Sequence, residues 1–169
     1  YAVIMAGGRG TRFWPLSRET GPKHLLNITG EKSIIRQTVD RIKPLVEEEN
    51  IYVVTVASHA GDVADQLPML PRENIIVEPV GRNTAPCIGL VSLYLKKKDP
   101  GKTMIVLPAD HLITDEKRFI ETVSAAGEAA EKSSSLITIG ITPAGPETGY
   151  GYVEKGIIVD TVMGRDIFA

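Results

Sequence analysis

The chain alternates short apolar runs of strand length with segments of helical period, and this alternation most narrows the folds open to it. The short runs are rich in Val and Ile at successive positions, as strands covered on both faces should be. They lie at residues 2–5, 51–56, 75–77, 104–107 and 136–141. Helix-period segments lie between them at 34–45, 84–97 and 119–126. The pattern predicts an α/β fold with a doubly wound, mostly parallel sheet and helices on both faces.

Composition narrows the class of protein further. A chain of 169 residues can bury a full core, so we expect one domain over residues 1–169. The formal net charge of −2 provides no basic field for nucleic acid, and no apolar stretch reaches the length of a membrane span. Cys87 stands alone and cannot form an intrachain disulfide, which fits a reducing cytoplasm. We therefore expect a cytoplasmic domain that binds neither nucleic acid nor membrane, and we leave a homodimer open.

The first apolar run leads into a glycine-dense segment that contains Gly7, Gly8 and Gly10. Glycine has no side chain to keep a ligand away and allows positive φ, so backbone N–H groups can converge on an anion. Arg12 and Lys23 follow and add positive charge. The alternative is a tight surface turn with scattered charges. The combination predicts a phosphate-binding loop.

Two familiar phosphate-binding loops do not fit this segment. A P-loop requires Gly-Lys-Ser/Thr, but Gly10 is followed by Thr11 and Arg12. The dinucleotide fingerprint requires a third glycine where Phe13 stands, which counts against a dinucleotide-dependent oxidoreductase. Pro15 also disfavours a long helix at this point. The segment is therefore expected to form a wide loop over a nucleotide.

Asp110 follows the fourth apolar run by three residues and is the candidate metal ligand. A carboxylate there can hold Mg²⁺, which prefers oxygen ligands and keeps several waters while it bridges phosphates. The alternative is an aspartate that forms a turn. The glycine segment, Glu78 and Asp110 each follow a strand, and ligands of open α/β sheets bind beyond the carboxyl ends of strands. We therefore expect these residues on one edge of the sheet.

Glu78 and Pro79, followed by Asn83, Thr84 and Ala85, are the candidates for base recognition. A carboxylate can accept hydrogen bonds from N1–H and the exocyclic amine of guanine. The N-terminus of the helix that begins near Thr84 adds free N–H donors. The alternative is an ordinary strand-to-helix connection in which Asn83 or Thr84 caps the helix.

Residues 147–152 place two glycines and two tyrosines at alternate positions before a predicted strand. Gly149 would let backbone amides approach a polar ligand, and Tyr150 and Tyr152 could line a sugar. Glu154 would share their strand face and accept from sugar hydroxyls. The alternative is an edge strand without a ligand.

These motifs resemble those of a known enzyme family. The run Gly7-Gly8-x-Gly10-Thr11-Arg12, with Trp-Pro-Leu-Ser at 14–17 and Pro-Lys at 22–23, resembles the signature of sugar-phosphate nucleotidyltransferases. Segments 78–86, 107–111 and 146–152 are similar to those of the mannose-1-phosphate guanylyltransferases. The resemblance covers most of residues 1–155. Arg9 and His24 depart from it, because such enzymes often have a small residue and Gln there.

The resemblance implies a Rossmann-like nucleotidyltransferase domain that is incomplete at its C-terminus. It would transfer GMP from GTP to mannose 1-phosphate with Mg²⁺ and release pyrophosphate. Catalysis is assigned to Arg12, Lys23 and Asp110, with Asp110 as metal ligand. The implied nucleotide-binding residues are Ala6, Gly7, Gly8, Gly10, Thr11, Arg12, Glu78, Pro79, Asn83, Thr84 and Ala85, and the sugar-binding residues are Gly149, Tyr150 and Glu154. Transfer to glucose 1-phosphate from dTTP or ATP, and a non-catalytic nucleotide-binding module, remain alternatives.

Overall fold

The computed structural model describes residues 1–7, 25–26 and 32–169. Two compact units make up these residues, unit 1 from Tyr1–Glu116 and unit 2 from Lys117–Ala169. The expectation of a single domain stays a prediction. Within the described ranges, no helix combines the length and the apolar character needed to cross a membrane.

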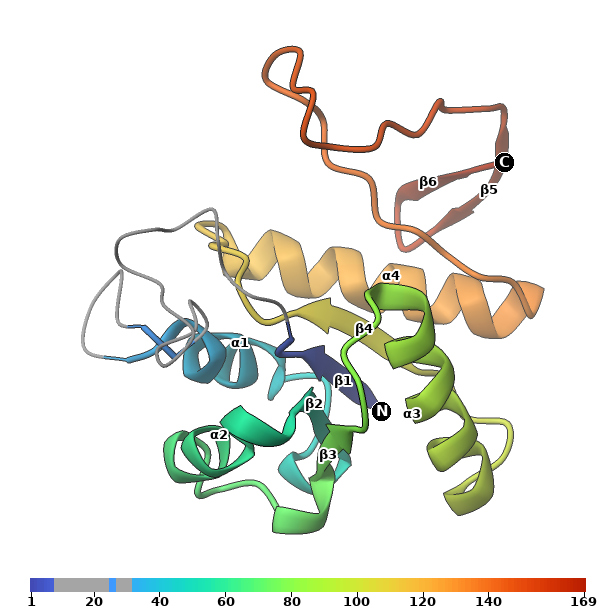
Figure 1. The fold of residues 1–169 in the computed structure, drawn as a ribbon. Helices are drawn as coiled ribbons and strands as arrows, with labels where there is room; N and C mark the ends of the chain where they lie inside the picture. The colour runs from blue at the N-terminus through green and yellow to red at the C-terminus, as the bar shows by residue number, and fades with distance from the viewer. Residues whose placement is uncertain (8–24, 27–31) are drawn as a thin grey trace. The chain divides into compact units, whose positions relative to one another are not determined.

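Unit 1 is built on a parallel sheet of four strands in the order β3-β2-β1-β4 (Figure 1). The strands are β1 (Ala2–Met5), β2 (Ile51–Val56), β3 (Ile75–Glu78) and β4 (Ile105–Pro108). Met5 pairs with both Val54 and Pro108, and Val56 pairs with Glu78. The carboxyl ends of all four strands therefore lie along one edge, which we call the C-terminal edge of the sheet.

The described residues of unit 1 also include the α-helices that connect the strands. They are α1 (Ile34–Ile42), α2 (Ala60–Gln66) and α3 (Thr84–Lys98), with short 3₁₀ turns at Glu48–Asn50, Ala57–His59 and Arg72–Asn74. Ser33 begins α1, because its side chain accepts a hydrogen bond from the backbone N–H of Arg36. The last turn of α3 carries Lys96, Lys97 and Lys98, and cations are favourable at that end of a helix.

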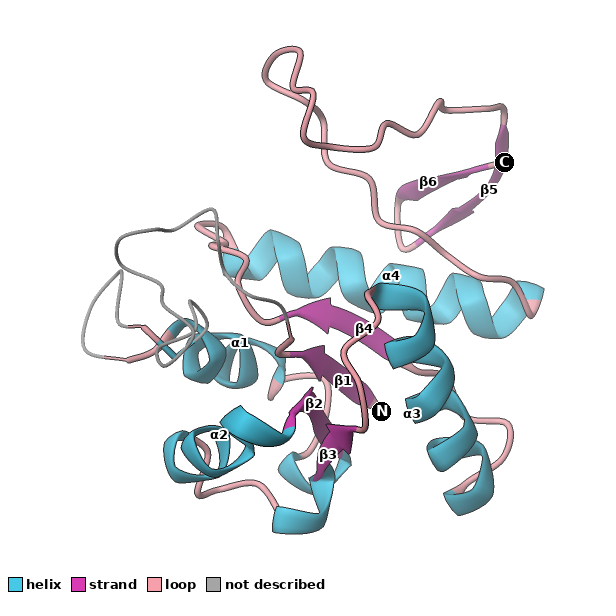
Figure 2. Cartoon of the chain, in the orientation of Figure 1, coloured by secondary structure: helices cyan, strands magenta, loops and turns pink. Residues whose placement is uncertain are grey.

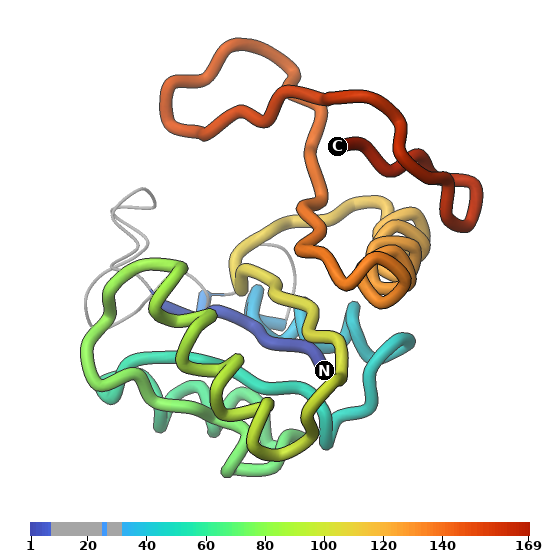
Figure 3. The backbone as a smooth tube through the Cα atoms, turned by 90° about the vertical axis from the view of Figure 1, so that its right-hand side faces the viewer, coloured from blue at the N-terminus to red at the C-terminus, as the bar shows by residue number. Residues whose placement is uncertain are grey.

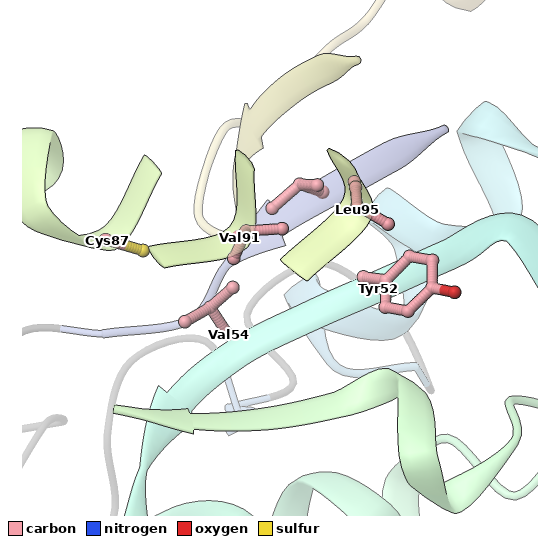
Figure 4. Packing of buried hydrophobic residues seen from close by; sticks show 6 residues of the cluster. Tyr52, Val54, Cys87, Val91 and Leu95 are labelled. Atoms are coloured by element: carbon pink, nitrogen blue, oxygen red, sulfur yellow. The ribbon is translucent and has the colours of Figure 1, made fainter. Parts of the chain in front are cut away.

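One face of the sheet is covered by α3. Cys87, Val91 and Leu95 of this helix pack with Val3, Tyr52 and Val54 in one buried cluster (Figure 4). Side chains four residues apart share a helix face, and side chains two residues apart share a strand face. The spacing of these apolar residues therefore sets which side of α3 meets the sheet.

The opposite face of the sheet is covered by α1 and α2. Ile4 and Val53 are fully buried, and alternation along a strand points them away from the α3 cluster. Helix α1 contacts β1 and α2 contacts β3, and Figures 1 and 3 show α1 and α3 on opposite sides of the strands. Right-handed crossovers account for the two faces. The chain moves in one direction along the sheet from β1 to β3 through α1 and α2, and in the opposite direction from β3 to β4 through α3, so α3 lies on the other face. The direction reverses between β1 and β4, which is the switch point of the sheet.

Unit 2 contains α4 (Glu116–Ser133) after its first residue, a long loop and the antiparallel hairpin of β5 (Ile158–Val162) and β6 (Arg165–Phe168) (Figure 2). Ala125 and Ala129 of α4 form a small buried cluster with Val162. Arg165 donates to Glu121 of α4 across 3.0 Å. Small helix residues and this ion pair bring the hairpin against α4.

The predicted α/β fold is confirmed, and predicted strands 2–5 and 51–56 coincide with β1 and β2. The predicted strand at 136–141 is wrong, because no strand forms there. The side chains of Leu136 and Ile141 are exposed, and no neighbouring strand in unit 2 takes up the backbone N–H and C=O groups of this segment. The sequence pattern does not predict α2 or β6.

Candidate functional site

The C-terminal edge of the sheet gathers three of the predicted site segments. Gly7 lies two residues beyond β1, Glu78 ends β3, and Asp110 lies two residues beyond β4. The backbone N–H of Ala109 donates to the carbonyl of Met5 over 3.1 Å, so the ladder between β1 and β4 continues to the residue before Asp110. Gly7 and Asp110 therefore flank the switch point of the sheet, as predicted.

Glu78 is buried at this edge, with only 8% of its surface exposed. A Cβ atom built on Gly7 would lie 3.7 Å from Oε2 of Glu78, so the carboxylate faces the backbone where the glycine segment begins. Because β2 lies between β1 and β3, the Glu78 side chain extends across the end of β2. The Cys87 thiol of α3 lies close enough to the same carboxylate for its charge to act on the thiol. Glu78 therefore presents its carboxylate beside Gly7 and Cys87.

The Cys87 thiol supplies a direct test of this arrangement. Burial, with a contribution from the Glu78 carboxylate, raises the pKa of Cys87 from 9.0 to about 11. A rise of this size lowers the thiolate fraction near pH 8 by roughly a hundredfold. We expect iodoacetamide to modify Cys87 about a hundredfold more slowly in the folded protein than in urea, and more slowly than in a folded Glu78→Gln variant. Because folding favours the neutral thiol, this contribution to stability is present below pH 9 and is lost as the pH rises towards 11. Equal rates in the folded and unfolded protein would contradict the buried pair.

Asn83 precedes α3 with φ 64° and ψ −166°, a backbone conformation used almost only by glycine. Its side chain makes no hydrogen bond to the helix N-terminus, so the alternative in which Asn83 caps α3 is wrong. Capping residues normally have an extended backbone, which Asn83 does not. Thr84 and Ala85 form the exposed first turn of α3, and Pro79 is exposed beyond β3. A strained backbone conformation like that of Asn83 costs about 1–3 kcal/mol, and such conformations are concentrated at functional sites.

Asp110 is half-buried at the edge of the sheet. Within the described part of the chain, no three His, Cys, Asp or Glu side chains come together as a metal site. Mg²⁺ is commonly held by one or two carboxylates together with waters and substrate phosphates. A single carboxylate here therefore fits a magnesium ion that is shared with a nucleotide, and it does not fit a site made only of protein ligands.

Several predicted site residues lie outside the described residues. They are Gly8, Gly10, Thr11, Arg12 and Lys23. Their roles in phosphate binding and catalysis stay predictions.

The predicted sugar-binding residues lie in a loop of unit 2. Gly149, Tyr150 and Glu154 are exposed, and the segment is not a strand, so the predicted shared strand face is wrong (Figure 2). The loop closes on itself instead: the Tyr152 hydroxyl accepts from the N–H of Glu147 over 2.7 Å and lies 3.2 Å from the carbonyl of that residue. An open depression of about 520 Å³ is lined by residues of this loop, including Glu147 and Tyr150.

Two threonines at the C-terminal edge were not predicted as site residues. Thr55 donates its hydroxyl to the carbonyl of Ala6 over 3.0 Å, and Thr38 lies 3.4 Å from the carbonyl of Ala109. Both side chains are buried. The sequence offers one sign of both residues. Thr55 in the strand pattern of 51–56 and Thr38 in the helix pattern of α1 each carry a hydroxyl where the pattern predicts an apolar side chain.

Comparison with known proteins assigns the family. The family model for nucleotidyl transferases matches residues 1–163. The chain belongs to the nucleotidyl transferase family. A mannose-1-phosphate guanylyltransferase of Escherichia coli (strain K12) is 46% identical over 160 residues, which are 92% of this chain and 33% of that protein. The xanthan biosynthesis protein XanB of Xanthomonas campestris pv. campestris (strain B100) is 44% identical over 91% of this chain and 33% of its own length.

A solved structure agrees with these relatives. The crystal structure of a protein described as mannose-1-phosphate geranyltransferase from Thermus thermophilus is 36% identical, with a TM-score of 0.69. The similarity covers 78% of this chain and 38% of that one. The resemblance predicted from the motifs is confirmed, and the chain is a homologue of mannose-1-phosphate guanylyltransferases. It spans about a third of the length of these curated relatives.

Proposed function

We propose that this chain carries the nucleotide site of an enzyme that transfers GMP from GTP to mannose 1-phosphate and releases pyrophosphate. The observation that carries the proposal is the C-terminal edge, where Glu78 lies beside Gly7 and Asp110 follows the neighbouring strand, in a member of the nucleotidyl transferase family. The substrates are those in the name of the guanylyltransferase relatives. We place this enzyme in the cytoplasm, which the single cysteine of the chain also fits.

The Glu78 carboxylate indicates which end of GTP lies beside Gly7. A phosphate group there would be repelled by the buried charge, whereas the N1–H and amino groups of guanine would donate to it. We therefore place the base beside Gly7 and Glu78, with Ala6, Pro79, Asn83, Thr84 and Ala85 around the nucleoside. The phosphates would then extend towards Asp110, with the backbone of Gly8, Gly10 and Thr11 against them.

The chemistry requires positioning more than proton transfer. A phosphate oxygen of the sugar phosphate attacks the α-phosphorus of GTP, a new P–O bond forms, and the bond to pyrophosphate breaks. The nucleophile is already anionic, so no general base is needed, and the main obstacle is repulsion between anions. Arg12 would bind the departing β- and γ-phosphates, and Lys23 would neutralise charge near the reacting phosphorus.

Asp110 would hold Mg²⁺, which supplies Lewis-acid charge neutralisation at phosphate oxygens when it is bound. Its position at the switch point suits a carboxylate that meets the ion on the phosphate side of the nucleotide. Gly149, Tyr150 and Glu154 would contact the sugar. The exposure of Tyr150 and Glu154 leaves both side chains available to a ligand.

Pyrophosphate release from the complete protein tests the proposal. GTP, ATP and dTTP would each be combined with mannose 1-phosphate and with glucose 1-phosphate, and binding would be followed by calorimetry. Release mainly from GTP and mannose 1-phosphate supports the proposal. Release mainly from ATP or dTTP identifies another sugar-phosphate nucleotidyltransferase, and binding of GTP without release identifies a non-catalytic module.

Replacing Glu78 with Gln is expected to weaken GTP relative to ATP by about tenfold to a hundredfold. The amide retains one acceptor oxygen but loses the charge and presents an N–H group where guanine also donates, and a paired contact of this kind contributes about 1–3 kcal/mol. Dissociation constants for both nucleotides would be measured by calorimetry. Glu73→Gln makes the same change at an exposed residue beside β3 and should leave both constants unchanged. An unchanged ratio in Glu78→Gln would move base recognition to other groups.

A further inference from the structure

The two buried threonines contact equivalent places at the ends of the two strands that flank the switch point. Ala6 is the first residue after β1, and Ala109 is the first residue after β4. Each precedes a proposed site residue, Gly7 in one case and Asp110 in the other. The carbonyl of Ala6 accepts from Thr55, and that of Ala109 lies within reach of the Thr38 hydroxyl.

The bond from Thr55 marks the point where the chain leaves the sheet. The N–H of Ala6 still donates to the carbonyl of Val54 over 2.8 Å, as a continued parallel ladder requires. The carbonyl of Ala6 accepts from a side-chain hydroxyl of β2 over 3.0 Å. Ala6 and Thr55 are both fully buried, so this carbonyl has no access to bulk water. The hydroxyl therefore fixes the direction in which the backbone continues to Gly7.

Thr38 acts on the other strand from α1. Its hydroxyl lies 3.0 Å from the carbonyl of Ile34, one turn earlier in the helix, and 3.4 Å from the carbonyl of Ala109. Only 2% of its surface is exposed. The N–H of Ala109 donates to Met5, and its carbonyl shares the single proton of the Thr38 hydroxyl with the carbonyl of Ile34.

We propose that Thr55 and Thr38 are positioning residues of the nucleotide site: Thr55 holds Ala6 and Gly7 against Glu78, and Thr38 holds Ala109 and Asp110 at the end of β4. The expected changes in nucleotide and metal binding rest on the proposed function. Both threonine side chains are buried, so each would act through the backbone of the residue that follows the alanine. Loss of either hydroxyl is expected to alter one part of the site and spare the other.

Valine tests this best, because it keeps the shape of threonine and removes the hydroxyl. In Thr55→Val we expect the dissociation constant for metal-free GTP to rise about tenfold, and the preference for GTP over ATP to fall. In Thr38→Val we expect the dissociation constant for metal-free GTP to stay within about twofold of the wild-type value. The affinity of the GTP-bound protein for Mn²⁺, measured by EPR, should fall severalfold. Thr55→Ser and Thr38→Ser keep a donor and should restore wild-type behaviour.

Amide hydrogen exchange tests the same part of the backbone in the absence of nucleotide. Exchange at the Ala6 amide, which is bonded to Val54, should accelerate about tenfold in Thr55→Val and stay unchanged at the Ala109 amide, which is bonded to Met5, with the opposite pattern in Thr38→Val. Ser92→Ala is the matched control, because it removes a hydroxyl that donates to a backbone carbonyl over 2.7 Å inside α3, away from the edge. It should change neither the binding constants nor exchange at these two amides.

The outcomes separate a positioning role from a structural one. If both valine variants lower the melting temperature and change every readout equally, the hydroxyls only stabilise the fold and the proposal is overturned. If a valine variant does not fold, Thr55→Cys or Thr38→Cys provides a weaker donor, and unchanged exchange in it at the Ala6 or Ala109 amide also overturns the proposal. If exchange responds as expected while Glu78→Gln leaves base preference unchanged, the positioning role stands and the proposed base contact fails.

Discussion

Arg12→Ala and Lys23→Ala are each expected to lower kcat/KM for GTP by about a hundredfold to a thousandfold, with little change in melting temperature. Losing one preorganised charge or donor at a reacting centre costs about 3–4 kcal/mol. Arg12 should act mainly through the departing pyrophosphate, and Lys23 through the reacting phosphorus. Both residues lie outside the periodic core pattern, so the free energy of unfolding should hardly change.

Steady-state kinetics of the complete protein would measure this, with melting followed in parallel. Arg72→Ala and Lys96→Ala remove the same charges from exposed positions in a 3₁₀ turn and at the end of α3, and should leave kcat/KM unchanged. Arg12→Lys and Lys23→Arg separate charge from geometry, because arginine presents a planar fork and lysine a compact ammonium. Wild-type kinetics in either alanine variant would remove that residue from the phosphate site.

The sheet could be predicted from the sequence because its strands are buried on both faces. Continuous runs of Val and Ile mark β1 and β2 unambiguously, and helical spacing marks α1 and α3. Helix α2 was not predicted because it has no apolar stripe: Val63 is its only buried residue. The apolar segment 136–141 has the composition of a strand, but composition cannot supply the neighbouring strand that its backbone requires.

The site could be located from the sequence, but its contacts could not. Parallel strands place the residues that follow them on one edge, which was enough to predict that Gly7, Glu78 and Asp110 lie along it. The pairing of Glu78 with Cys87 depends on how α3 packs against the sheet, which no local pattern encodes. The positive φ of Asn83 is likewise a property of the turn that joins β3 to α3. Because glycine is almost the only residue that adopts this backbone conformation, an asparagine at this position gives no sign of it in the sequence.

Replacing Asp110 with Asn is expected to lower turnover at saturating Mg²⁺ by about a hundredfold or more and to leave metal-free GTP binding nearly intact. The amide keeps the size of the side chain and one acceptor oxygen, but it loses the charge that a hard cation requires. The backbone should stay in place, because Ala109 is bound through its N–H to Met5 and contacts Thr38 through its carbonyl. The loss would therefore report the missing charge.

A turn residue behaves differently, and this difference makes the substitution decisive. Asp and Asn both suit turns, so Asp110→Asn would be nearly silent if Asp110 only shaped the chain after β4. Asp115→Asn makes the same change at an exposed residue just before α4 and should not alter turnover. Turnover and GTP affinity would be measured against Mg²⁺ concentration in both variants. If the Asp110→Asn curve coincides with that of the wild-type protein, Asp110 does not hold the metal, and another oxygen ligand must bring Mg²⁺ to the phosphates.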